Sequence, residues 1–226
     1  MRYLIMTTSL ILSACVAVNP KPTMEEQMVK SEARIALGLR YFQQGNMIKA
    51  RENLYKALNH APNYHRALVA VAYYLSETGE TASANTMYLQ ALRAKPNDGE
   101  INNDYAVFLC KQANYNLAQH HFSQAIASPT YFKTSIAYEN AAFCALEAKN
   151  STQARYLFER ALSHDKNRRQ SIINLAQLDI LDGQTENACH RLSAFQQRFG
   201  AHPLVLKLLK RIGPEVCVPS ARELSQ

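Results

Sequence analysis

Tryptophan is absent from the 226 residues of the chain, and glycine occurs only seven times. No glycine-rich phosphate loop, HExxH, paired CxxC or Gly-x-Ser-x-Gly motif occurs, which leaves nucleotide, zinc and hydrolase chemistry without a recognisable site. The adjacent residues His120 and His121 would point about 100° apart on a helix, whereas metal binding prefers a pair on one face. We therefore expect no catalytic residues, no metal site, no cofactor and no enzymatic activity.

The apolar run at the start of the chain is also short. Tyr3 to Leu12 spans about ten residues, too few to cross a bilayer, and follows the basic Arg2 as in a secretory signal. Leu12 is too large for an ordinary cleavage site before Cys15, although an incidental cysteine there remains the alternative. Leu12-Ser13-Ala14-Cys15 instead resembles a bacterial lipobox. This resemblance implies a signal peptide over residues 1–14 and lipidation of Cys15.

Residues 15–30 are expected to form a lipidated tether. Pro20 and Pro22 interrupt this stretch, which has no apolar periodicity. Several acyl chains on Cys15 would anchor the protein permanently, since a single chain binds membranes only marginally. Val16 follows the cysteine, where lipoproteins of enterobacterial type carry Asp as an inner-membrane retention signal. The resemblance therefore implies that the protein is lipid-anchored in the outer membrane and faces the periplasm.

The chain has few concentrated charges, although its formal net charge is +7. Basic residues are scattered singly, apart from Lys166, Arg168 and Arg169. An exported lipoprotein meets no nucleic acid, so we expect no nucleic-acid partner and assign these side chains to a solvated face.

The cysteine count of five is odd for an exported protein. If Cys15 carries lipid, the other four can pair in three ways. Local order along the chain favours Cys110 with Cys144 and Cys189 with Cys217. Each bridge would stabilise the protein by about 2–4 kcal/mol, mainly by restricting the unfolded chain.

A period of 34 residues runs through the chain and is that of tetratricopeptide repeats. It separates Gly45 from Gly79, Pro62 from Pro96, and Ala50 from Ala84. Small residues that would let paired helices approach recur at Gly38, Ala72, Ala106, Ala142 and Ala176. Repeats are expected to begin at Ser31, His65, Gly99, Ser135 and Arg169, with two residues added around Tyr131 and Phe132.

The predicted fold class is therefore all-α, a tetratricopeptide-repeat superhelical solenoid over residues 31–202 with about five repeats. Residues 203–226 are expected to form a capping helix and tail, because Pro203 opens a helical segment that Gly213-Pro214 stops. A generic helical protein with chance spacing would not give four concordant repeats.

A largely apolar groove is expected on the concave face. In tetratricopeptide arrays the second, fifth, ninth and twelfth residues of each repeat face this side. Counting from Ser31 and His65 gives Glu32, Ile35, Leu39, Phe42, Arg66, Val69, Tyr73 and Ser76. The apolar members Ile35, Leu39, Phe42, Val69 and Tyr73 are the candidate partner-binding groove. Val107, Phe143 and Leu146 extend it. Such a surface suits an amphipathic segment or strand, although packing under a neighbouring helix remains the alternative.

Three short motifs resemble those of the type IV pilus biogenesis lipoproteins called PilF or PilW. Asn140, Ala141 and Cys144 match the family's NAxxC, and Pro129 and Tyr131 match its PxY. The family's NNxYxxFLC run is matched by Asn102, Asn103, Tyr105, Phe108, Leu109 and Cys110. The resemblance implies a bridge between Cys110 and Cys144. Lys166 replaces the usual terminal proline of a repeat, and Cys189 and Cys217 are additional.

The family resemblance implies a protein that binds secretin subunits and promotes their localisation or multimerisation in the outer membrane, so that pili can emerge. Its partners would be the secretin and, through the lipid, the outer membrane. The alternative is a lipid-anchored adaptor for periplasmic proteases or cell-wall enzymes. The sequence leaves open whether the concave or the convex face is used.

Overall fold

The computed structural model describes residues 22–213 and residue 217. The expected signal peptide, Cys15 and the first part of the tether lie outside these residues. All regular secondary structure in the described part is helical, as predicted. The helices are α1 (Met24–Gln43), α2 (Met47–His60), α3 (His65–Glu77), α4 (Thr81–Ala94), α5 (Gly99–Lys111), α6 (Tyr115–Ala127), α7 (Thr134–Glu147), α8 (Ser151–His164), α9 (Arg169–Leu181), α10 (Thr185–Phe199) and α11 (Pro203–Ile212).

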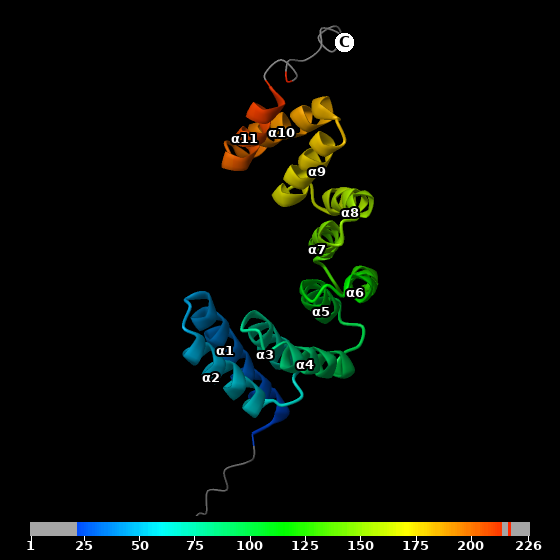
Figure 1. The fold of residues 1–226 in the computed structure, drawn as a ribbon. Coiled ribbons are helices and arrows are strands. Elements are labelled where there is room, and N and C mark those ends of the chain that lie inside the picture. Colours follow the sequence, from blue (N-terminus) through cyan, green and yellow to red (C-terminus); the bar gives the residue numbers. More distant parts are fainter. Residues whose placement is uncertain (1–21, 214–216, 218–226) are drawn as a thin grey trace, which may run out of the picture.

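Consecutive helices pack in pairs, and the pairs follow one another along an arc (Figure 1). The first helices of successive pairs touch as well, since α1 contacts α3, α3 contacts α5, and α5 contacts α7. Figure 1 shows α5 and α7 on the hollow side of the arc and α6 and α8 on its outer side. The first helices of neighbouring repeats therefore form a shared surface.

The repeat boundaries follow the sequence period closely. Helices α3, α5 and α9 begin at His65, Gly99 and Arg169, as expected, and α7 begins one residue before the expected start at Ser135. The C-terminal helix begins at Pro203 and is followed by Gly213, whose φ of 96° favours glycine. The 34-residue period therefore locates these helices almost to the residue.

Helix α1 departs from the expected boundary, because it begins at Met24 rather than near Ser31. A capping box fixes this start: the Thr23 side chain accepts a hydrogen bond from the Glu26 amide, and the Glu26 carboxylate accepts one from the Thr23 amide at 2.9 Å. Residues 24–30, assigned to the tether from the sequence, are thus the first turns of α1.

The small residues of the repeat motif lie where helices approach most closely. A Cβ atom on Gly38 would stand 2.7 Å from Cγ of Leu54 on the partner helix α2. The corresponding alanines Ala72, Ala106 and Ala142 are fully buried. A larger side chain here would force the helix pair apart.

Of the two added residues, one is buried between repeats and the other is exposed. Tyr131 is buried against Ala125 and Ala137, and a Cβ on Gly99 would stand only 2.4 Å from the Tyr131 Cβ. Phe132, in contrast, is 95% exposed. The insertion thus packs one of its aromatic rings beneath the start of α5 and leaves the other in solvent.

Two disulfides join elements in the structure. Cys110 on α5 is linked to Cys144 on α7, with 5.7 Å between their Cα atoms. Cys189 on α10 is linked to Cys217 beyond α11, with a Cα distance of 5.4 Å. These are the two pairings favoured by local order. The first bridge ties neighbouring repeats together, and the second holds the segment after the capping helix to α10.

We predict that Cys110 and Cys144 are oxidised to each other in the exported protein. Peptide mapping without reductant should recover the linked pair. Replacing both residues with serine should lower the free energy of unfolding by about 2–4 kcal/mol, because the unfolded chain loses a constraint. Free alkylation of both thiols in native protein from the periplasm would contradict the prediction.

Candidate partner-binding groove

Helices α1, α3 and α5 border a hollow of about 580 Å³ on the surface shared by the first helices. We call it the N-terminal groove. It is lined by all five apolar candidates, Ile35, Leu39, Phe42, Val69 and Tyr73. Of the three polar residues that the same repeat count selects, Arg66 lines the hollow and Glu32 and Ser76 do not. The fold therefore brings together residues that are up to 38 positions apart in the sequence. Their role in binding a partner stays a prediction.

The helical period explains this arrangement. Ile35, Leu39 and Phe42 are spaced by four and three residues, which puts them on one face of α1, and Val69 and Tyr73 are four apart on α3. The Phe42 and Tyr73 rings meet edge to face, with centroids 5.4 Å apart. The two helices thus contribute to one apolar strip.

The strip is only partly covered by neighbouring helices. Ile35 is 6% exposed and belongs to the core, which fits the alternative that such residues pack under a neighbour. Tyr73 is 40% exposed, and Leu39, Phe42 and Val69 are half-buried. Four of the five side chains therefore remain accessible to a ligand, with Ile35 beneath them.

The α5 end of the groove is charged, which the expectation of a largely apolar face did not include. Asp98, Glu100, Asp104 and Lys133 line it there, and Lys133 Nζ lies 2.6 Å from a Glu100 carboxylate oxygen. Counting from Gly99 would have given Glu100 as the second position of the third repeat. Lys133 lies in the loop before α7, where no helical count applies.

Other groove residues come from the start of α3. Burial and the nearby Lys95 lower the pKa of His65, which favours the neutral form of its ring. Arg66 forms an ion pair with Glu32 of α1 at 3.2 Å. Its charge is therefore balanced locally, and the three carboxylates at the α5 end outnumber Lys133.

The carboxyl group of Asp104 has a raised pKa. Burial raises its pKa to about 6, and the charge of Glu100 adds to this, whereas the hydrogen bond from Asn103 and the charge of Lys133 oppose it. The Asn103 amide donates to the Asp104 carboxylate at 3.1 Å and in turn accepts from the Asn140 amide on α7 at 3.1 Å. A chain of amides thus connects Asp104 to the next repeat.

We predict that Asp104→Asn stabilises the protein at pH 7.5. Because folding raises the pKa of Asp104 from about 4, this group contributes most to stability below about pH 4, and the contribution is lost as the pH rises through 6. The variant should gain about 1–2 kcal/mol, or a few degrees in Tm, at pH 7.5 and little at pH 4. A variant less stable than the parent at pH 7.5 would contradict this.

The apolar residues of later repeats do not extend the N-terminal groove. Val107 and Phe143 line a separate hollow of about 370 Å³ beside the Cys110–Cys144 bridge. Leu146 borders a third, of about 280 Å³, between α7, α9 and α11. Val107, Phe143 and Leu146 therefore line hollows other than the N-terminal groove.

The family-like residues of α5 hold the repeats together. The buried Asn102 side chain donates to the carbonyl oxygens of Pro96 and Asp98, both at 2.9 Å. The Tyr105 hydroxyl donates to Asn85 on α4 at 2.9 Å. The ring of His121 bonds to the Asn102 side chain at 2.8 Å, so His121 is engaged in packing. These motif residues explain the geometry of the third repeat.

Within residues 22–213 and 217, no group of three or more His, Cys, Asp or Glu side chains is arranged to hold a metal ion. None of the described helices is long and apolar enough to cross a membrane.

Sequence comparison identifies two relatives, although no family model matches the chain. An uncharacterised protein of Haemophilus influenzae is 32% identical over 165 residues, which cover 73% of this chain and 91% of that protein. The type IV pilus assembly protein PilF of Pseudomonas aeruginosa is 30% identical over 178 residues, covering 77% of this chain and 70% of that protein.

Solved structures agree with these relatives. The structure of Pseudomonas aeruginosa PilF superposes with a TM-score of 0.73 at 28% identity, covering 82% of this chain and 84% of that one. PilW, described as a widely conserved type IV pilus biogenesis factor, gives 0.71 at 25%, covering 83% and 88%. The tetratricopeptide-repeat protein YrrB gives 0.55 at 17%, covering 81% and 94%, a likeness of fold alone. The predicted tetratricopeptide fold is thereby confirmed.

Proposed function

Because the chain belongs to the family of the type IV pilus biogenesis factors PilF and PilW, we propose that it binds pilus secretin subunits through the N-terminal groove. Binding would promote the localisation and multimerisation of the secretin in the outer membrane, and so the emergence of pili. The observation that carries the proposal is the accessible apolar strip on α1 and α3.

The groove has the chemistry to hold an amphipathic segment. Burying one large apolar side chain of a partner contributes about 1.5–3 kcal/mol, so two or three such anchors on the Leu39, Phe42 and Tyr73 strip support useful affinity. The carboxylates at the α5 end, among them Glu100, would favour a basic residue on the partner and fix the direction of the bound segment. The proposed role requires only that the protein bind and position the secretin.

In this proposal, lipidation of Cys15 would localise the protein to the outer membrane. With the signal 1–14 removed and α1 beginning at Met24, the tether between the lipid and the solenoid is residues 16–23, which reach about 25 Å when extended. Helix α1 is the first element after this tether and carries three of the five groove residues. The groove would therefore meet a secretin subunit close to the outer membrane.

Co-purification tests the proposed partner. Affinity-tagged full-length protein, extracted with detergent from cells that make type IV pili, should retain the secretin, and a tag-free extract should not. Recovery of periplasmic proteases or cell-wall enzymes without secretin would contradict the proposal and support the adaptor alternative.

A further inference from the structure

The positive charge of the described chain is concentrated at one end. Residues 22–148 contain eleven lysines and arginines and eleven acidic residues, whereas residues 149–213 contain eleven lysines and arginines and only five acidic residues. The basic residues that look scattered in the sequence therefore gather in the last repeats. Figure 1 shows α10 and α11 at the end of the arc opposite the start of α1.

A hollow of about 360 Å³ lies in this basic region, between the end of α8, α9 and α10. We call it the C-terminal hollow. Its apolar lining includes Leu162, Ile172, Phe195 and Phe199. Its polar lining is Asn187 and the basic side chains Lys166, His190, Arg191 and Arg198, with no acidic residue among the lining side chains. The hollow thus combines an apolar surface with a cationic rim.

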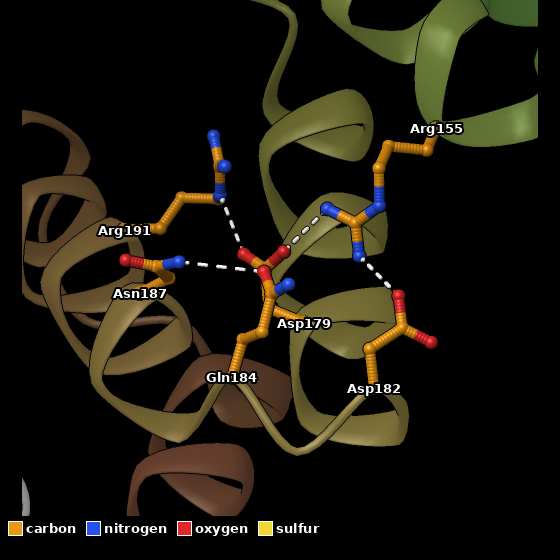
Figure 2. Close-up of polar contacts among 6 residues, drawn as sticks. All are labelled: Arg155, Asp179, Asp182, Gln184, Asn187 and Arg191. Atoms are coloured by element: carbon orange, nitrogen blue, oxygen red, sulfur yellow. Dashed lines mark hydrogen bonds and ion pairs between the residues drawn. The ribbon is translucent and has the colours of Figure 1, made fainter. Parts of the chain in front are cut away.

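A buried carboxylate orients one of the cations. Arg191 Nε donates to Asp179 at 3.1 Å, and Asp179 is 1% exposed (Figure 2). The other Asp179 oxygen pairs with Arg155, which also reaches Asp182 at 2.9 Å. Figure 2 shows the terminal nitrogens of Arg191 pointing away from Asp179. These nitrogens remain available for an anion while the rest of the guanidinium is held in place.

Two further cations at the hollow form no ion pair with a described residue. Among the described residues, no carboxylate lies within ion-pair distance of Lys166 or Arg198. The Arg198 guanidinium lies 5.5 Å from the Phe199 ring centroid, and that of Arg169 lies 4.8 Å from the same centroid. Two guanidinium groups therefore lie close to the Phe199 ring, and a ligand carboxylate could approach them there.

We propose that the C-terminal hollow is a second binding site, for a peptide segment that combines acidic and apolar side chains. The acidic groups would pair with Lys166 and Arg198, and an apolar side chain would cover Phe199. A small inorganic anion would leave the apolar lining uncovered. The N-terminal groove, with its carboxylates at the α5 end, would disfavour the same segment, so the two sites select partners of different charge.

The position of the hollow favours a peptide over a lipid surface. If the membrane anchor is on Cys15, as proposed above, the membrane lies at the α1 end of the arc and the hollow at the other (Figure 1). If the arc extends away from the membrane, the headgroups of that membrane do not reach the hollow. A peptide segment of a periplasmic partner meets no such restriction.

Fluorescence polarisation tests this site with detergent-solubilised full-length protein. The probe is a labelled peptide Gly-Ser-Glu-Phe-Glu-Leu-Ser, and its control has both Glu residues replaced by Gln. The acidic peptide should bind at least about tenfold more tightly than the control, and its affinity should fall as salt is raised from low to high concentration.

A charge-reversal pair tests the lining residues. Lys166→Glu with Arg198→Glu should weaken binding of the acidic peptide at least about tenfold. The matched pair Lys30→Glu with Arg93→Glu makes the same change in net charge on exposed residues of α1 and α4, outside the hollow, and should leave binding unchanged. Circular dichroism checks that both variants fold.

The proposal would be overturned if the two peptides bind equally or if neither binds. It would also be overturned if both charge-reversal variants lose the same affinity for the acidic peptide, or if anionic-lipid vesicles bind and the acidic peptide does not. The last outcome would identify a lipid site. Retention of secretin by the Lys166→Glu, Arg198→Glu variant is expected in any case, so failure here is distinguishable from failure of the proposed function.

Discussion

Leu39→Asp is expected to abolish secretin multimers and surface pili while the protein stays folded. Leu39 is half-buried in the N-terminal groove, so the new carboxylate can remain solvated in the free protein. In the complex it would be buried without a partner, which costs several kcal/mol. Truncating a central anchor alone often costs more than about 2 kcal/mol, or about thirtyfold in affinity. Tyr73→Asp should behave in the same way, because Tyr73 is the most exposed of the five residues.

Gels of secretin multimers and microscopy of piliated cells measure the effect. Tyr156→Asp is the matched control, since Tyr156 on α8 is 54% exposed and lies outside the groove. Circular dichroism and membrane fractionation confirm that each variant is folded and located like the parent. If Leu39→Asp and Tyr73→Asp both assemble normal multimers, the secretin must bind elsewhere. The hollow beside the Cys110–Cys144 bridge, which Asn140 lines, is then the next surface to test.

Cys15→Ser is expected to release a folded protein from the outer membrane. The proposed acyl chains on Cys15 would bury many methylenes at about 0.8 kcal/mol each, and their loss would remove the anchor entirely. The first helix of the solenoid begins at Met24, nine residues after Cys15, so we expect the helix pairs to form without the lipid. Cell fractionation should find the variant outside the membrane pellet, and its circular dichroism spectrum should match that of the parent.

A second cysteine variant controls for this experiment. Cys189→Ser removes one half of the Cys189–Cys217 disulfide and should leave membrane association unchanged, because this bridge is not part of the proposed anchor. Unchanged membrane association of Cys15→Ser would contradict the lipoprotein interpretation.

Much of the fold follows from a single sequence property, the 34-residue period. Small residues such as Gly38 and Ala72 must stay small where helices touch, so packing imposes the repeat on the sequence. The early start of α1 was missed because it depends on the local capping box of Thr23 and Glu26, which precedes the repeat pattern. Periodicity thus located the repeats, and local capping determined where the first one begins.

The apolar part of the N-terminal groove could be predicted from the sequence, because it follows the same repeat period. Its apolar members lie on regular helices, where a count of positions identifies the inner face. Its charged end includes Asp98 from a turn and Lys133 from the loop with the added residues, and these depend on how the repeats bend against each other. The contact of Arg155 with Asp179, 24 residues apart, likewise follows from tertiary packing. Lys166, which the sequence marks as a missing proline and as part of a short basic cluster, lines a hollow that depends on the packing of α8, α9 and α10.

Site-specific photo-crosslinking in living cells tests the central proposal most directly. A photoreactive amino acid replaces Tyr73 in the N-terminal groove, or Tyr156 on α8 as the control. The account predicts a covalent adduct with the secretin from position 73 and none from position 156. An adduct from position 156 alone, or from neither position while secretin still multimerises, would contradict the proposal that the groove binds the secretin.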